Sequence, residues 1–306
     1  MQDILMIGAG PAALTAAVYT TREDIDTVLL EKAVIGGLAA TTDWIDNYPG
    51  FPEGISGLDL AENLRKQAER FGAKIELDEV SNIRKEGDVV VLDTFSGERR
   101  AKAVLIATGT EYKKLGIPGE AEYLSRGVHY CATCDGAFYR DKNIIVVGGG
   151  NSAVQEALFL TKFASHIDLL VRSDVFRASD VLLHELEKNK QITVHMNTTT
   201  DEIIGDGSKV TAVKGTDKKA NKQVTFQTDG VFVFVGLKPN TQFLGKDIEL
   251  DEIGFVKTND RLETSLPGVF AAGDVRSGAT MQIATAVGEG ATAALRIREY
   301  LETLKK

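Results

Sequence analysis

The segment DILMIGAGPAALTAAVY, residues 3–19, decides the fold of this chain. Its apolar run, residues 4–7, has the composition of a buried strand and leads into a glycine pattern, after which alanine-rich residues favour a helix. A second apolar run, TVLLE, ends at Glu31, about twenty residues beyond the last glycine. Strand, glycine turn, helix, strand and acidic residue in this order predict a βαβ unit that binds a dinucleotide.

Each position of the pattern GAGPAA has a physical role in such a unit. Gly8 permits the tight turn after the strand, Gly10 lets a pyrophosphate approach the backbone, and Ala13 lets the helix pack closely on the strand. The helix N-terminus then faces the phosphates, and the Glu31 carboxylate can accept hydrogen bonds from ribose hydroxyls. These four residues are therefore expected to bind a cofactor.

A second copy of the pattern lies in NIIVVGGGNSAVQEALFL, residues 143–160. Gly148, Gly150 and Ala153 follow another apolar run and precede another helical stretch. The next strand, in HIDLLVRSD, ends in Arg172 where the first copy has an acid, and a basic residue there suits a 2′-phosphate. This copy therefore predicts an NADP-type site. The alternative is a relic that keeps its glycines only for packing.

The order of the remaining segments predicts a nested arrangement. The segments AKAVLIATGT and LPGVFAAGDV have the pattern of further strands, and a helical pattern follows in MQIATAVGEGATAALRIREYL. Breaks in these patterns near residues 113–119 and 238–243 separate a central segment from the parts of the chain on either side of it. The expected fold class is α/β, with two Rossmann-like nucleotide-binding domains, one inserted in the other.

Composition narrows the class of protein. The chain has 306 residues, of which 43% are hydrophobic and 26% charged, as in soluble globular proteins with room for two domains. Its net charge of −9 argues against nucleic acid and anionic membranes as partners. It contains no long apolar run and no secretory signal pattern, so a cytoplasmic location is expected.

The segment YCATCDG, residues 130–136, holds both cysteines of the chain, Cys131 and Cys134. A structural zinc site needs four ligands, and of the four histidines only His129 lies near this pair in the sequence. Two cysteines also do not make a disulfide framework. The C-x-x-C spacing therefore favours a redox-active dithiol, and no metal is expected.

Five motifs in order, GAGPAA, ATGT, YCATCDGAFY, GGGNSAVQEA and VFAAGDV, resemble the low-molecular-weight thioredoxin reductases along essentially the whole chain. The resemblance implies a homodimeric flavoprotein with FAD as cofactor and thioredoxin as partner. It implies an FAD-binding domain over residues 1–112 and 243–306. The inserted domain, residues 113–242, would carry the cysteines, and the two domains would rotate relative to one another during turnover.

The resemblance also implies roles for single residues. Cys134 matches the sulfur that faces the flavin, Cys131 the sulfur that attacks the partner disulfide, and Asp135 the acid that moves a proton. The alternative for Asp135 is a helix-capping carboxylate. Asp274 matches an aspartate that faces the flavin ribityl chain, with a plain N-cap as the alternative. Asn47 matches an asparagine beside the flavin, although it could serve a turn before Pro49.

A helix that starts near Gln282 would direct its positive end at the flavin. The fingerprint and the resemblance together give the expected cofactor-binding residues: Gly8, Gly10, Ala13, Glu31, Gly37, Leu38, Asn47, Thr108, Gly109, Asp274, Met281 and Gln282.

The chain departs from the family pattern in three places. Where NADPH-using members have H-R-R-x-x-x-R, this chain reads VRSDVFR, so Arg172 and Arg177 match but Val171 and Ser173 replace a histidine and an arginine. The one lost guanidinium removes a charge-assisted contact to a phosphate. In addition, Leu38 replaces a usual glutamine, and Met281 replaces a common arginine. Gly148, Gly150, Ala153, Arg172 and Arg177 are then a possible remnant of an NADP site.

These departures resemble the ferredoxin-dependent flavin thioredoxin reductases, so ferredoxin is the expected electron donor. Basic loops at residues 84–85, 98–102, 113–114 and 218–222 are candidate docking sites for such an acidic partner. The alternatives are an NADPH-dependent thioredoxin-disulfide reductase with a weakened 2′-phosphate clamp and a non-enzymatic flavin and thiol redox sensor.

Overall fold

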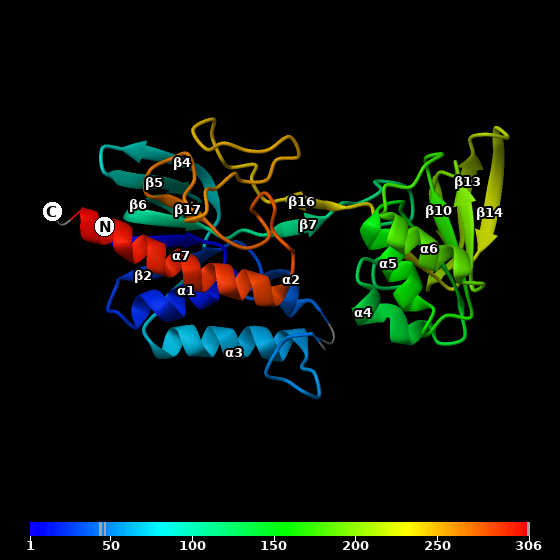
Figure 1. Ribbon diagram of the computed structural model, residues 1–306, viewed down its shortest axis with the longest axis horizontal. Helices are drawn as coiled ribbons and strands as arrows, with labels where there is room; N and C mark the ends of the chain where they lie inside the picture. The colour runs from blue at the N-terminus through cyan, green and yellow to red at the C-terminus, as the bar shows by residue number, and fades with distance from the viewer. Residues whose placement is uncertain (43–44, 46, 305–306) are drawn as a thin grey trace. The chain divides into compact units, whose positions relative to one another are not determined.

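The computed structural model describes residues 1–42, 45 and 47–304, with the backbone alone for residues 133 and 134 (Figure 1). The chain divides into two compact units. Unit 1 comprises Met1–Glu111 and the segment from Lys238 onward, and unit 2 is Tyr112–Leu237. The chain thus returns to unit 1 ahead of the expected position 243. Strands β7 (Thr110–Tyr112) and β16 (Leu237–Pro239), which lie at the two crossings, pair with each other.

Unit 1 is built on a seven-stranded sheet of order β3-β2-β1-β6-β5-β4, in which β17 also pairs with β6. Strands β1, β2, β3, β6 and β17 run parallel to one another. Strand β5 runs antiparallel to both of its neighbours, β6 and β4. The long strand β6 serves both groups, because its first half pairs with β5 and its second half with β17. The strands are β1 (Gln2–Ile7), β2 (Thr27–Glu31), β3 (Lys74–Leu77), β4 (Val80–Glu86), β5 (Val89–Thr94), β6 (Gly97–Ile106) and β17 (Val269–Ala271).

Helices α1, α3 and α7 lie side by side against this sheet (Figure 1). Helix α1 is buried along nearly its whole length, which explains why its sequence is apolar on every side. Strand β1, helix α1 and strand β2 confirm the βαβ unit predicted from the first glycine pattern. The helices are α1 (Pro11–Thr21), α2 (Gly37–Ala40), α3 (Gly57–Arg70) and α7 (Ile283–Thr303).

Unit 2 contains a five-stranded parallel sheet of order β11-β10-β9-β15-β8 and an antiparallel sheet of order β12-β13-β14. Buried residues of α5 and of β9 and β10 share one core, and a second core includes residues of β13 and β15. The elements are β8 (Val128–His129), α4 (Ala132–Asp135), the 3₁₀ helix η1 (Gly136–Tyr139), β9 (Asn143–Val147), α5 (Asn151–Leu160), β10 (His166–Val171), α6 (Asp180–Lys188), β11 (Ile192–Met196), β12 (Glu202–Gly205), β13 (Val210–Asp217), β14 (Lys222–Gln227) and β15 (Gly230–Val233). The predicted α/β class with two Rossmann-like domains is confirmed.

Two α-helices of unit 1 approach each other at a glycine. A Cβ atom at Gly290, in α7, would lie 2.1 Å from the carbonyl oxygen of Ala12 in α1. No side chain fits such a gap, so this glycine sets the distance between the two helices. At Gly288, one helical half-turn earlier, a Cβ atom would meet nothing within 4 Å.

We expect Gly290→Ala to lower the free energy of unfolding by about 1–3 kcal/mol, because the added methyl must push α1 and α7 apart. The matched control Gly288→Ala should be neutral or stabilising by up to about 1 kcal/mol, since alanine is the better helix former. Urea denaturation followed by circular dichroism measures both. Equal stability of the two variants would contradict the packing described here.

Candidate functional site

The first glycine turn is fixed by a close approach of two backbones. Gly8 has a φ of +98°, and a Cβ atom there would lie 2.6 Å from the carbonyl oxygen of Ala107. Its N–H donates to the carbonyl oxygen of Leu30 at 2.8 Å, so the turn is held on both sides. At Gly10, by contrast, a Cβ atom would meet nothing within 4 Å. Gly10 is the N-cap of α1 and brings no capping side chain, so the helix N-terminus is left open to an anion.

Glu31 braces this turn. Its Oε2 accepts a hydrogen bond from the Ala9 N–H at 2.8 Å, and its Oε1 accepts one from the Ala33 N–H at 2.9 Å. The side chain is buried, so these bonds fix the carboxylate in place. A carboxylate can accept about four hydrogen bonds, and so each oxygen keeps a lone pair for a ribose hydroxyl.

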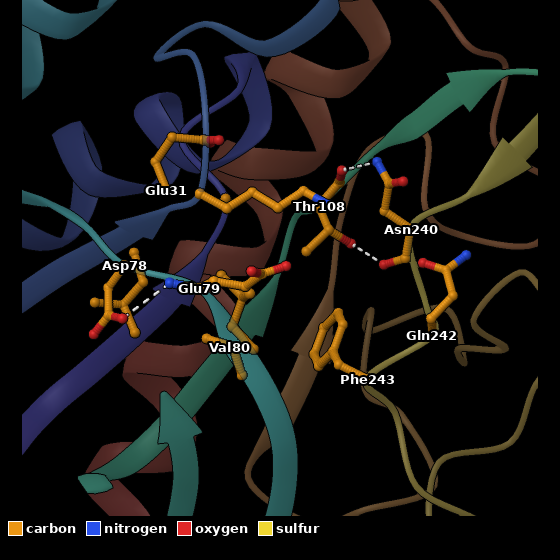
Figure 2. A pocket seen from close by; sticks show the side chains of 12 residues that line it. Glu31, Asp78, Glu79, Val80, Thr108, Asn240, Gln242 and Phe243 are labelled. Carbon is orange, nitrogen blue, oxygen red and sulfur yellow. Dashed lines mark hydrogen bonds between the residues drawn. The ribbon is translucent and has the colours of Figure 1, made fainter. Parts of the chain in front are cut away.

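A cleft of about 560 Å³, part of it open to solvent, lies beside Glu31 (Figure 2). Thr108 lines it after the end of β6, where its Oγ1 donates to the Asn240 carbonyl oxygen at 2.8 Å, and the Asn240 Nδ2 donates to the Thr108 carbonyl oxygen at 2.9 Å. The Asn240 N–H also donates to the carbonyl oxygen of Gly109. The cleft is lined by Ile7, Gly8, Leu30, Glu31, Lys32, Asp78, Glu79, Val80, Thr108, Asn240, Gln242 and Phe243.

Sequence reasoning missed much of this cleft. Residues 78–80 and 240–243 lie far from the glycine pattern in the chain and carry no motif of their own. Only the parallel strand order, which places the ends of β2 and β6 on either side of β1, brings them to Glu31 and Thr108. Clefts at the carboxyl ends of parallel strands are the usual place for a dinucleotide.

Gly37 and Leu38 lie at the other side of the glycine turn. The Gly36 N–H donates to the Ala9 carbonyl oxygen at 2.7 Å and so brings α2 to the turn. A Cβ atom at Gly37 would lie 3.7 Å from the Cα of Gly10. Leu38, in the same short helix, is half-buried and has an apolar side chain at the position where the family pattern usually has a glutamine.

The N-terminus of α7 brings Gln282, Met281 and Asn47 together. Gln282 is the N-cap of α7, as predicted for a helix that starts near it. The Asn47 Nδ2 donates to the Gln282 Oε1 at 3.1 Å, which links two residues far apart in sequence. Met281 has a φ of +58°, a left-handed conformation that costs a residue with a side chain about 1–2 kcal/mol. Such local strain is kept only where the surrounding structure imposes it.

Asp274 follows β17 and is not the N-cap of α7, so the capping alternative is wrong for this helix. Burial and, to a smaller extent, the neighbouring charge of Glu289 together raise the pKa of Asp274 from 3.8 to about 6. Glu289 itself accepts the Gly273 N–H at 2.7 Å and pairs with Arg276. A half-buried carboxyl without an ion pair among the described residues is suited to bind a polar group of a ligand.

The cysteine motif begins directly after strand β8 of unit 2. Cys131 is disulfide-bonded, and no cysteine among the described residues is free. Cys134 belongs to α4, but its side chain lies outside the described part of the chain. Asp135 stands at the N-cap of η1 yet makes no side-chain capping bond. Its Oδ2 instead lies 3.0 Å from the Nδ1 of His129, so the capping alternative is wrong here too.

The second glycine turn repeats the first. Gly148 has a φ of +148°, and a Cβ atom there would lie 2.3 Å from the carbonyl oxygen of Phe234. At Gly150 a Cβ atom would meet nothing within 4 Å, and Ala153 is fully buried where α5 packs on the sheet. Val171, which replaces the expected histidine, is 1% exposed and belongs to the core of unit 2.

Arg172 and Arg177 lie near this second turn. Arg172 directly follows β10, and the Arg177 N–H donates to the carbonyl oxygen of Gly149 at 2.7 Å. A bridge between Gly150 and Arg177 holds the two segments together. Both arginines are exposed, and neither forms an ion pair with any described residue. Two unpaired guanidinium groups beside an open glycine turn fit a nucleotide phosphate.

Within the described part of the chain, no group of three or more His, Cys, Asp or Glu side chains is placed to hold a metal ion. Among the same residues, no helix combines the length and apolar composition that crossing a bilayer requires.

We expect Asp274→Asn to stabilise the FAD-free protein at pH 7 by about 2–3 kcal/mol, because the variant has no buried carboxyl to ionise. The folded protein binds the Asp274 proton more tightly than the unfolded chain, so this cost develops as the pH rises from about 4 to about 6. Urea denaturation of variant and parent should therefore differ at pH 7 and agree near pH 4. The same difference at both pH values would contradict the raised pKa.

Comparison with known proteins agrees with this geometry. Residues 2–290 match the family of pyridine nucleotide-disulphide oxidoreductases. The chain is 42% identical to a thioredoxin reductase of Bacillus subtilis, over 99% of this chain and 96% of that protein. It is also 42% identical to a thioredoxin reductase of Treponema pallidum, over 99% of this chain and 98% of that protein.

Solved structures give the same result. The Lactococcus lactis thioredoxin reductase in its FR conformation superposes with a TM-score of 0.80 at 40% identity, covering 99% of this chain and 100% of that one. The Streptococcus pyogenes thioredoxin reductase gives a TM-score of 0.81 at 41% identity, covering 99% of both chains. The chain therefore belongs to the pyridine nucleotide-disulphide oxidoreductases and, within them, to the thioredoxin reductases, whose cofactor is FAD.

Proposed function

We propose that this thioredoxin reductase passes electron pairs from FAD through the Cys131 and Cys134 dithiol to the disulfide of a thioredoxin. The observation that carries the proposal is the disulfide-bonded Cys131, which lies two residues after the end of the buried strand β8. The Asp135 carboxylate, which contacts His129, follows four residues later. Bound FAD supplies the two-electron redox chemistry that amino acid side chains lack. The glycine turn at Gly8, Glu31 and the adjacent cleft would hold its adenosine and pyrophosphate parts.

The cysteines carry out thiol–disulfide exchange. In the reduced protein, the Cys131 thiolate attacks one sulfur of the partner disulfide, and that bond breaks to leave a mixed disulfide. Cys134 then attacks the Cys131 sulfur, which releases the dithiol of the partner and restores the disulfide of the reductase. Two electrons and two protons leave with the partner. Asp135 takes up and returns a proton during this exchange, as a carboxylate within reach of the motif can do.

For the electron donor we infer a reduced nicotinamide nucleotide, bound at the glycine turn of unit 2. Support comes from the open Gly150 position and from the exposed, unpaired Arg172 and Arg177 beside it. NADPH fits two guanidinium groups, although Ser173 supplies no third one. We expect a weaker preference for NADPH over NADH than a clamp of three arginines would give.

Ferredoxin remains the second candidate, favoured by the replacements at Ser173, Leu38 and Met281. Two of the basic loops expected to dock it are occupied by internal ion pairs. Arg84 pairs with Glu86, Asp93 and Glu98, and Arg100 pairs with Glu86 and Glu98. Neutralised loops of this kind attract an acidic protein weakly. The homodimer remains a prediction from the resemblance, and the cytoplasmic location remains a prediction from the sequence pattern.

We expect Arg177→Met to raise the KM for NADPH by about tenfold or more, because a charge-assisted contact to the phosphate is lost. The KM for NADH should change little. Arg140→Met is the matched control, since Arg140 is also exposed but precedes β9, at the sheet edge opposite the glycine turn. Equal effects of Arg177→Met on both nucleotides would contradict a 2′-phosphate contact.

Anaerobic titration separates the two donors. About two equivalents of NADPH supply the four electrons that the flavin and the disulfide accept together, and they should bleach the flavin absorbance of the purified protein. If NADPH leaves the flavin oxidised and reduced ferredoxin bleaches it, the nucleotide proposal fails and ferredoxin is the donor.

We expect Cys134→Ser to abolish thioredoxin reduction while the donor still reduces the flavin. The remaining Cys131 should form a stable mixed disulfide with thioredoxin, visible by mass spectrometry of the intact complex. Loss of flavin reduction in this variant would count against the role proposed for Cys134.

A further inference from the structure

A buried histidine lies between the cysteine motif and the sheet of unit 2. His129, on β8 two residues before Cys131, is 8% exposed. Its Nδ1 lies 3.0 Å from the Oδ2 of Asp135, and its Nε2 lies 2.7 Å from the hydroxyl oxygen of Tyr139. Asp135, His129 and Tyr139 therefore form a continuous chain of hydrogen bonds that starts beside the cysteines and ends in the core.

Aromatic packing fixes the imidazole of His129. Its ring stacks on that of Phe232, with 5.2 Å between the ring centres, and makes an edge contact with the Tyr139 ring, with 5.3 Å between the centres. The Tyr139 ring in turn needs Gly230, where a Cβ atom would lie 2.2 Å from the ring. Packing on two sides restricts the imidazole, and its two nitrogens contact Asp135 and Tyr139.

The partners also fix which nitrogen carries the proton. Burial, together with the charges of Asp135 and Asp229, raises the pKa of Tyr139 to about 12, so its hydroxyl keeps its proton. A protonated phenol donates to the Nε2 of His129, and a neutral imidazole then carries its hydrogen on Nδ1. That hydrogen points at the Asp135 carboxylate.

We propose that His129 is a positioning residue that acts through Asp135: its Nδ1–H orients the carboxylate that follows the cysteine pair in the sequence. The proposal rests on the proton-transfer role proposed for Asp135 above. Each exchange cycle requires Asp135 to accept a proton and to give it back. A fixed donor restores the same ionised carboxylate, in the same orientation, after every cycle.

Two other charged groups, Asp229 and Lys142, lie near the hydrogen-bonded series Asp135, His129 and Tyr139. Asp229 precedes β15 and acts on Tyr139, and the Lys142 ammonium lies 5.5 Å from the centre of the Tyr139 ring. Both act on Tyr139, the residue of this series farthest from Asp135. The donor to Asp135 is His129, so the effect of His129 on the reaction should pass through Asp135 alone.

A double-mutant cycle in the intact FAD-loaded protein tests this. His129→Phe keeps an aromatic ring but removes both nitrogens, and His129→Asn keeps an N–H donor where Nδ1–H stood. We expect His129→Phe to slow thioredoxin reduction at pH 7 by about tenfold and to move the acidic limb of the pH profile upward by about one pH unit. His129→Asn should restore most of the rate. In an Asp135→Asn background, His129→Phe should have no further effect.

Three results would overturn the proposal. The first is an unchanged pH profile in His129→Phe, and the second is that His129→Phe slows the Asp135→Asn variant by the same factor as it slows the parent. The third is that His129→Asn does not restore the rate. If His129→Phe does not fold, Tyr139→Phe replaces it. Without the Tyr139 hydroxyl, no described residue donates to the His129 Nε2, so the imidazole hydrogen is no longer held on Nδ1. That variant should move the pH profile in the same direction by a smaller amount, and an unchanged profile would be equally decisive.

A second readout separates this proposal from the proposed function. The rate at which iodoacetamide alkylates the reduced cysteines, measured against pH by mass spectrometry, needs neither thioredoxin nor an electron donor. We expect His129→Phe to change this profile in the parent but not in the Asp135→Asn background. If the parent fails to reduce thioredoxin, the proposed function fails while the alkylation profiles still decide the role of His129.

Discussion

Two close backbone contacts hold the nucleotide-binding architecture of this protein together. At Gly8 and at Gly148 the chain leaves a buried strand in a conformation with positive φ, and in both places a carbonyl oxygen of a neighbouring segment occupies the space of a missing side chain. The carbonyl oxygens belong to Ala107 and Phe234, each just beyond the end of the adjacent parallel strand. Because of these contacts, both helices that follow start at an open glycine with no capping side chain.

The two units use the same turn in different ways. In unit 1, the buried Glu31 carboxylate accepts hydrogen bonds from Ala9 in the turn and from Ala33 in its own loop, and segments from distant parts of the chain complete the cleft. In unit 2, no acid stands at the end of the second strand, and Arg172 and Arg177 provide positive charge instead. The cysteine motif belongs to unit 2 and precedes its glycine turn. The turn braced by Glu31 and the cysteine motif thus belong to separate units of one chain.

Local pattern predicted the elements, and long-range contacts supplied what it could not. The strand before Gly8, the strand that ends at Glu31 and the helix that starts near Gln282 are all present, because each has a clear apolar period and its own terminating residue. The hydrogen bond of Asn47 with Gln282, the tie between Thr108 and Asn240, and the anchoring of Asp135 by His129 join residues whose proximity depends on the topology. A carboxylate after a cysteine motif reads equally well as a helix cap, and only the position of β8 decides against it. The electron donor depends on side chains of exposed loops, where no periodicity guides prediction.

The central claim is that one protein chain stores electrons in two places, FAD and the cysteine pair. Anaerobic titration with dithionite, with flavin absorbance and free thiols counted together, tests it most directly. Each of the two centres takes up two electrons, so the account predicts an uptake of about four electrons per FAD and the appearance of about two thiols. An uptake of about two electrons per FAD, with no new thiols, would contradict it.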